Sequence, residues 1–77
     1  MNVYTVRDKL IGYTGPMAFK DDKVAIRWFE SFCRAKKEQE YTETKYFDLY
    51  RIGEFNNETG EIIPVNPTEL VREGENT

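Results

Sequence analysis

Hydrophobic residues between positions 21 and 38 recur at the spacing of one face of an α-helix. Asp21 and Asp22 open this stretch, where a carboxylate can cap free backbone N–H groups and suits the positive end of the helix dipole. Lys36 and Lys37 suit its negative end. The pattern predicts an amphipathic helix over residues 21–38 whose apolar side holds Val24, Ala25, Trp28, Phe29, Phe32 and Ala35, with Ile26 and Cys33 at its flank.

Three other segments have the alternation or the β-branched and aromatic content of strands, namely residues 2–7, 46–55 and 61–65. Residues 56–60 read Asn-Asn-Glu-Thr-Gly and predict a hairpin turn in which Gly60 takes the left-handed conformation. Pro64 has no N–H to donate, so it either places the last strand at a sheet edge or ends its pairing there. Residues 9–20 contain two glycines and a proline and predict a structured loop with a short edge strand near Phe19.

This order of elements predicts a single α+β domain over residues 1–72, with a β-α-β-β arrangement. One helix would pack on a mixed sheet of three or four strands that ends in a C-terminal hairpin. A right-handed crossover through the helix would make the first two long strands parallel. Residues 66–72 would form one helical turn, and residues 73–77 an acidic disordered tail.

Both faces of the predicted strands are partly apolar, whereas one helix covers only one face. We therefore expect a second cover, most simply a homodimer. The alternative cover is the loop over residues 10–19 together with Leu70 and Val71.

Composition limits the classes of protein. The chain has 77 residues, enough for one small core, and a net charge of −3, which argues against a histone-like nucleic-acid binder. Residues 1–52 carry ten Lys or Arg against eight Asp or Glu, and residues 53–77 carry one against six, so the two parts have net charges of +2 and −5. The single cysteine and the absence of a long apolar stretch predict a cytoplasmic protein without a disulfide.

The residues do not support catalysis. There is no histidine, so nucleophilic triads and most zinc sites are excluded, and no glycine-rich phosphate-binding motif occurs. We expect neither enzymatic activity nor a metal or cofactor. Cys33 is either a reactive thiol or a small residue at the core edge, and Trp28 either stacks on a nucleic-acid base or packs in the core; packing is favoured for both.

Binding chemistry is concentrated on the polar side of the helix. We name this cationic row the basic stripe; it consists of Lys20, Lys23, Arg27, Arg34 and Lys37. Such a row can contact a phosphate backbone without reading bases, although a solvated helix face is the alternative. Tyr41, Tyr46 and Tyr50 would add stacking platforms or pack at the rim.

Three segments carry a family resemblance: MNVYTVRD at residues 1–8, GPMAF leading into DKVAIRWF at residues 15–29, and FDLYRIGEFNNETGEIIP at residues 47–64. They resemble the small non-structural protein of gokushovirus-like microviruses, which are single-stranded DNA phages. The resemblance implies a non-capsid accessory protein of the infected bacterium that acts in viral DNA synthesis or genome packaging. It brings no catalytic residues, and its signature positions Gly53, Glu54, Phe55, Thr59 and Gly60 read as structural.

The sequence thus favours non-specific binding of single-stranded DNA through the basic stripe. The alternative is an adaptor that engages a viral or host replication or assembly protein without touching nucleic acid.

Overall fold

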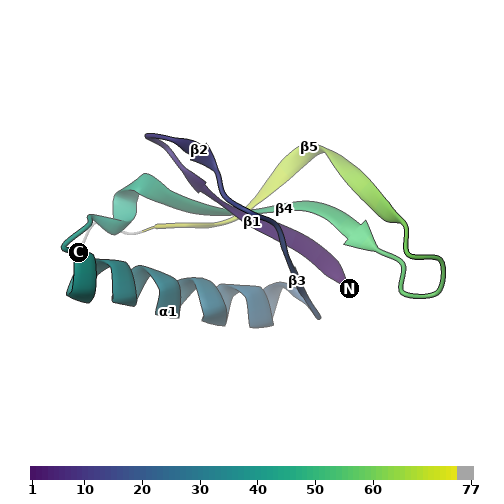
Figure 1. Ribbon diagram of the computed structural model, residues 1–77, viewed down its shortest axis with the longest axis horizontal. Helices are drawn as coiled ribbons and strands as arrows, with labels where there is room; N and C mark the ends of the chain where they lie inside the picture. Colours follow the sequence, from purple (N-terminus) through teal and green to yellow (C-terminus); the bar gives the residue numbers. More distant parts are fainter. Residues whose placement is uncertain (75–77) are drawn as a thin grey trace.

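The structure is a computed structural model that describes residues 1–74. Its elements, in chain order, are β1 (Asn2–Asp8), β2 (Gly12–Tyr13), β3 (Met17–Phe19), α1 (Asp22–Glu40), the 3-10 turn η1 (Thr44–Tyr46), β4 (Phe47–Phe55) and β5 (Ile62–Glu73). Helix α1 runs along one side of a single twisted sheet (Figure 1). This arrangement confirms the predicted α+β class. No helix in the described part of the chain is long and apolar enough to cross a membrane.

All strand pairs are antiparallel. The order is β2-β1-β4-β5, and β3 pairs with the same edge of β1 as a second short partner. Tyr13 of β2 lies opposite Arg7, while Phe19 of β3 lies opposite Asn2 at the other end of β1. The strand predicted near Phe19 is confirmed, and β2 is an addition to it.

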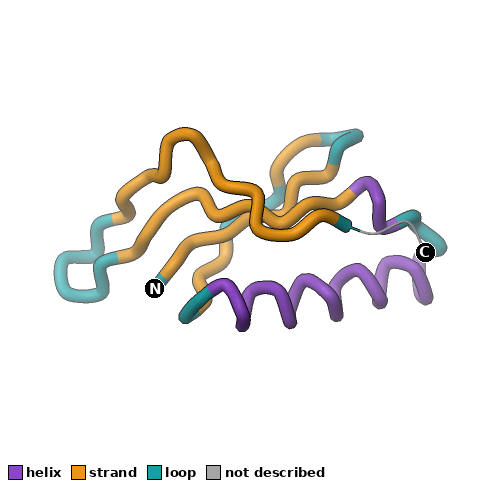
Figure 2. The backbone as a smooth tube through the Cα atoms, turned by 180° about the vertical axis from the view of Figure 1, so that it is seen from behind, coloured by secondary structure: helices purple, strands orange, loops and turns teal. Residues whose placement is uncertain are grey.

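The predicted parallel pairing of the first two long strands is wrong, because β1 and β4 are antiparallel. The physical reason is the turn back through β2 and β3, which returns the chain to the start of β1 before the helix begins. Helix α1 then carries the chain to the far end of β1, where the Lys9 N–H donates to the Tyr46 carbonyl at 2.8 Å. Strand β4 therefore starts beside the end of β1 and runs against it (Figure 2).

The predicted helical turn at residues 66–72 is also wrong, since β5 continues to Glu73. Register explains the irregular strand: Gly53 lies opposite Pro64, but Arg51 lies opposite Glu69, so residues 65–68 have only Ile52 across from them. These residues form an arch that rises away from α1 (Figure 1). Of the predicted acidic tail, Glu73 belongs to β5, and residues 75–77 lie outside the described part of the chain.

The hairpin between β4 and β5 forms as predicted. Gly60 has a positive φ of 79°, and its N–H donates to the Asn56 carbonyl at 2.8 Å. The Asn56 side chain accepts from the Glu58 N–H at 2.9 Å, which fixes the turn. Gly53 has a steric role, because a Cβ there would lie 2.8 Å from the Ile63 carbonyl oxygen. Strand β5 is the sheet edge that Pro64 predicts.

Helix α1 is held at both ends. Asp21 is the N-cap, and its carboxylate accepts from the Val24 N–H at 3.1 Å. Tyr41 closes the other end in the left-handed conformation, with φ 55°, and its N–H bonds to the Lys36 carbonyl. The helix prediction is confirmed, with the last turn extending two residues beyond position 38.

The core lies between α1 and the central strands β1 and β4. Its buried members are Tyr4, Val6, Ala25, Phe29, Phe47 and Leu49. Phe29 is the helix residue at the centre, whereas Trp28 and Phe32 are half-buried and stack on each other at 5.3 Å. Val24, which the periodicity assigns to the apolar side, is 42% exposed.

The sheet face away from α1 has no helix over it (Figure 1). The loop proposed as an alternative cover reaches this face only in part. Leu10 and Ile11 are 72% and 82% exposed, whereas the Thr14 carbonyl accepts from the hydroxyl of Thr5, which is buried. Val71 packs against the core on the α1 side. The sheet face away from α1 bears on binding below.

Candidate nucleic-acid interface

The basic stripe lies on the exposed side of α1. Four of its residues are in the helix, and Lys20 is in the bend just before it. All five side chains are exposed. For the four in the helix, periodicity turns their positions away from the buried pair Ala25 and Phe29. From Lys23 to Lys37 the row extends about 21 Å at 1.5 Å per residue.

Ion pairs divide the cations of the molecule into two groups. Carboxylate partners are present for Lys9, Lys36, Lys45, Arg51 and Arg72. Within residues 1–74, no carboxylate lies within ion-pair distance of Lys20, Lys23, Arg27 or Arg34. Four residues of the basic stripe are therefore available to an external anion.

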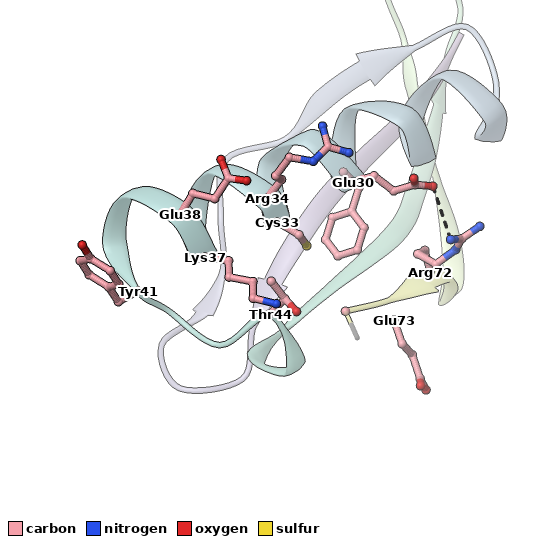
Figure 3. A pocket seen from close by; sticks show the side chains of 11 residues that line it. Glu30, Cys33, Arg34, Lys37, Glu38, Tyr41, Thr44, Arg72 and Glu73 are labelled. Atoms are coloured by element: carbon pink, nitrogen blue, oxygen red, sulfur yellow. Dashed lines mark ion pairs between the residues drawn. The ribbon is translucent and has the colours of Figure 1, made fainter. Parts of the chain in front are cut away.

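Glu30 is the one carboxylate in the middle of the row, and its side chain lies toward Arg72. Its Oε1 lies 3.5 Å from Nη1 of Arg72 on β5 (Figure 3). The positive charge of Arg72 offsets that of Glu30, so the acidic residue weakens the potential of the row less than its position in the sequence suggests.

A groove runs beside the C-terminal half of α1, with a cavity volume of about 750 Å³. Helix α1, Thr44 and the end of β5 form its walls (Figure 3). Arg34 and Lys37 border it, whereas Lys20, Lys23 and Arg27 lie outside. Three cations and three carboxylates line the groove, so the groove has no strong net charge. These residues are Arg34, Lys37 and Arg72, and Glu30, Glu38 and Glu73.

Cys33 lies on the inner wall of this groove. It is a free cysteine, half-buried and packed against the core. Burial first, and then the nearby carboxylates of Asp48 and Glu30, raise the pKa of the thiol to about 11. The thiol is therefore protonated at neutral pH and a poor nucleophile, in agreement with the predicted packing role.

Three tyrosines suggested as stacking platforms lie in different places. Tyr41 is 89% exposed at the rim of the groove (Figure 3). Tyr46 lies under the ammonium group of Lys45, which is 5.4 Å from the ring centroid. Tyr50 lies on the sheet, 5.9 Å from Tyr13. The structure does not gather them into one platform.

Two residues that the sequence analysis did not single out join Tyr50. The Arg7 guanidinium lies over the Tyr13 ring, 5.8 Å from its centroid. A hairpin prediction across Gly12 would have placed Arg7 and Tyr13 on neighbouring strands. Their approach to Tyr50 depends on the pairing of β1 with β4, which no local motif indicates.

In the described part of the chain, no group of three or more His, Cys, Asp or Glu residues is arranged to hold a metal ion.

Comparison with known proteins gives one match. The family model of the phage ORF5 protein matches residues 1–76. No curated protein and no solved structure matches. The match supports the phage part of the resemblance seen in the sequence.

Proposed function

The chain belongs to the phage ORF5 protein family, and from that premise we propose that it is an accessory protein that binds single-stranded DNA without sequence preference. The contact surface is the basic stripe on the outer side of α1. With the narrower resemblance, to non-structural proteins of gokushovirus-like microviruses, in support, we propose that it acts in viral DNA synthesis or genome packaging.

The observation that carries this proposal is the distribution of unpaired cations. Five lysines and arginines elsewhere, Lys9, Lys36, Lys45, Arg51 and Arg72, are engaged by carboxylates. Lys20, Lys23, Arg27 and Arg34 have no such partner within residues 1–74. Cations that lack an internal partner lose no ion pair when they bind phosphate. Their alignment along one helix fits a linear polyanion better than a compact ligand.

The net charge of −3 does not oppose this proposal, because the excess of carboxylates lies mainly in residues 53–77. Of these, Glu54, Glu58 and Glu61 lie on or beside the β4–β5 hairpin, which projects beyond the start of α1 (Figure 1). At physiological ionic strength charges separated by more than roughly 8 Å are largely screened. A strand on the helix therefore experiences mainly the local cations.

Backbone contacts of this kind position a strand without reading its sequence. About four phosphate contacts on single-stranded DNA give a log–log salt slope near −3, from roughly −0.7 per contact. We expect binding that is measurable at low salt and fades above physiological salt.

The test compares two double variants with the same net charge. Arg27→Gln/Arg34→Gln removes two unpaired cations, whereas Lys36→Gln/Lys45→Gln removes two that already pair with Glu40 and Glu43. The first variant should reduce the magnitude of the salt slope by about 1.4 and weaken retention of oligonucleotides. The second should bind nearly as wild type does.

All four side chains are at least partly exposed, so thermal transitions should change little and serve as the folding control. Equal losses in both double variants, or no binding by wild type at low salt, would show that the basic stripe is only a solvated face.

A second candidate function is that of a protein adaptor, and the β4–β5 hairpin favours it. This arm exposes Ile62 and Ile63, at 62% and 52%, beside the carboxylates of Glu58 and Glu61. An apolar pair within acidic surroundings suits a basic protein partner. Capture of such a partner that survives nuclease treatment and is lost in Ile62→Lys would favour the adaptor.

A further inference from the structure

The sheet face away from α1 carries a second group of side chains, separate from the basic stripe. Arg7 and Thr5 alternate on β1 with Val6 and Tyr4, whose side chains face α1. Tyr13 lies opposite Arg7, and Tyr50 lies opposite Thr5. Residues directly opposite each other in an antiparallel pair share a face, so Arg7, Tyr13 and Tyr50 gather on the side away from the helix.

The three side chains form a stack that is open to solvent. Tyr13 meets Tyr50 edge-to-face, with ring centroids 5.9 Å apart and an interplanar angle of 73°. The Arg7 guanidinium lies 5.8 Å from the Tyr13 centroid. Tyr13 is 55% exposed and Arg7 is exposed, so flat surface remains for another ring.

Arg7 is not neutralised within the described residues. Asp48 lies directly across from it, but Asp48 is buried and its carboxylate contacts Lys9, at 3.6 Å. The neighbouring Asp8 accepts from the Leu10 N–H at 2.9 Å. No carboxylate is within ion-pair distance of Arg7 in residues 1–74, so a ligand that supplies negative charge has a partner there.

The backbone that presents Tyr13 is fixed before any ligand arrives. Thr14 follows it directly, and the Thr14 N–H and hydroxyl both donate to the Val6 carbonyl, at 2.9 and 3.0 Å. The Thr5 hydroxyl donates to the Thr14 carbonyl at 2.8 Å. A site that is already ordered loses less conformational entropy on binding.

We propose that Arg7, Tyr13 and Tyr50 form a base-stacking site for single-stranded nucleic acid on the sheet face opposite α1. A base stacks against the exposed Tyr13 ring, and Arg7 contributes a guanidinium plane and a charge for the adjoining phosphate. Exposed aromatic rings combined with arginine are the usual means by which proteins hold single strands without reading their sequence. The proposal rests on the proposed function and adds to it the surface that contacts bases.

The site and the basic stripe lie on opposite sides of the molecule, and the end formed by η1 joins them. There the Lys9 ammonium donates to the Lys45 carbonyl at 3.0 Å, which keeps the end of β1 against η1. A strand that follows this end passes from the helix to the sheet face. Oligonucleotides of about 16 nucleotides, the upper range for one small binding domain, are the suitable probes.

The experiment separates stacking from phosphate contacts by using two probes of equal length, a thymidine oligonucleotide and an abasic one with the same backbone. Wild type should bind the thymidine probe at least about five-fold more tightly, the lower bound for one stacked base. Tyr13→Leu should lose this preference but keep its salt slope. Tyr13→Phe, which retains the ring, should keep both.

The outcomes distinguish the two proposals. If wild type binds both probes equally with a steep salt slope, the stacking site is refuted while the proposed function stands. If wild type binds neither probe, both are refuted. If Tyr13→Leu instead changes the sedimentation of the free protein, the face is covered by a second copy and the stacking site is again refuted.

Discussion

Tyr4 links the helix to the sheet through one side chain. It is fully buried, and its hydroxyl donates to Asp22 Oδ1 in the first turn of α1, at 2.5 Å. The pKa of the Tyr4 hydroxyl is raised to about 12. Burial is the largest cause, and the hydrogen bond to Asp22 is the second. The same residue thus fills the core and positions the start of α1.

We expect this pKa to make folding sensitive to alkali. The native state keeps the Tyr4 proton up to about pH 12, whereas an unfolded tyrosine loses it near pH 10. The native state then binds more protons than the unfolded state, so stability falls as the pH rises through this window. Tyr4→Phe should cost roughly 1–2 kcal/mol at pH 7, and the difference from wild type should shrink between pH 10 and 12.

Urea unfolding of both proteins at pH 7, 10 and 11.5 measures this difference. The two proteins differ by a single hydroxyl, so the comparison isolates Tyr4. A difference that stays constant across the three pH values would contradict the assignment.

Some roles of single residues follow from local sequence. Asp21 is predicted as a helix cap because carboxylates accept from free N–H groups at helix starts. Gly60 is predicted as a turn residue because only glycine enters the left-handed region freely. The grouping of Arg7 and Tyr13 with Tyr50 could not be predicted in this way, because it depends on the register of β1 with β2 and β4. The basic stripe could be predicted, because the positions that share one face of a helix follow from the sequence spacing alone.

At the scale of elements, α1 is the clearest test of the core. Phe29 is 1% exposed and lies at its centre, whereas Phe32 is only half-buried. Phe29→Ala should cost roughly 3–5 kcal/mol, a large part of the stability of so small a domain. Phe32→Ala should cost less, because the Phe32 side chain is already partly exposed.

Val24→Ala is the matched control on the same helix, since this side chain is 42% exposed. Its cost should stay below about 1 kcal/mol. Chemical denaturation of the three variants ranks them, and a Val24 variant as unstable as the Phe29 variant would refute the assignment of the helix faces.

The elements that have a local sequence pattern could be predicted, but the relative directions of the strands could not. Helical periodicity defines α1, and the turn chemistry of residues 56–60 defines the β4–β5 hairpin. The direction of β4 depends on a reversal through β2 and β3, which are two and three residues long. Strands this short give almost no pattern in a sequence, so the parallel prediction failed there.

At the scale of the whole molecule, the exposed apolar residues of β5 remain without a cover. Ile62, Ile63 and Leu70 are 62%, 52% and 47% exposed on the edge strand. We propose that a second copy covers this strand in a homodimer, because an apolar edge strand is a ready site for association.

Sedimentation equilibrium over a range of concentrations tests the dimer. Ile62→Lys/Ile63→Lys should shift the protein to monomer without unfolding it. The matched control is Leu10→Lys/Ile11→Lys, which places the same charges on two exposed apolar residues at a turn, at 72% and 82%. Wild type that is monomeric at every concentration, or a control with the same effect, would rule this interface out.

The central place of β1 determines when the chain can finish folding. During synthesis β1 is made before the other strands. It can pair early with β3, and α1 can then pack against it. Its other edge must wait for β4, about forty residues later, so the last closure depends on contacts between distant segments, which form slowly. A nascent chain that ends before residue 47 therefore carries an unpaired strand edge and an incompletely covered helix, both of which invite aggregation.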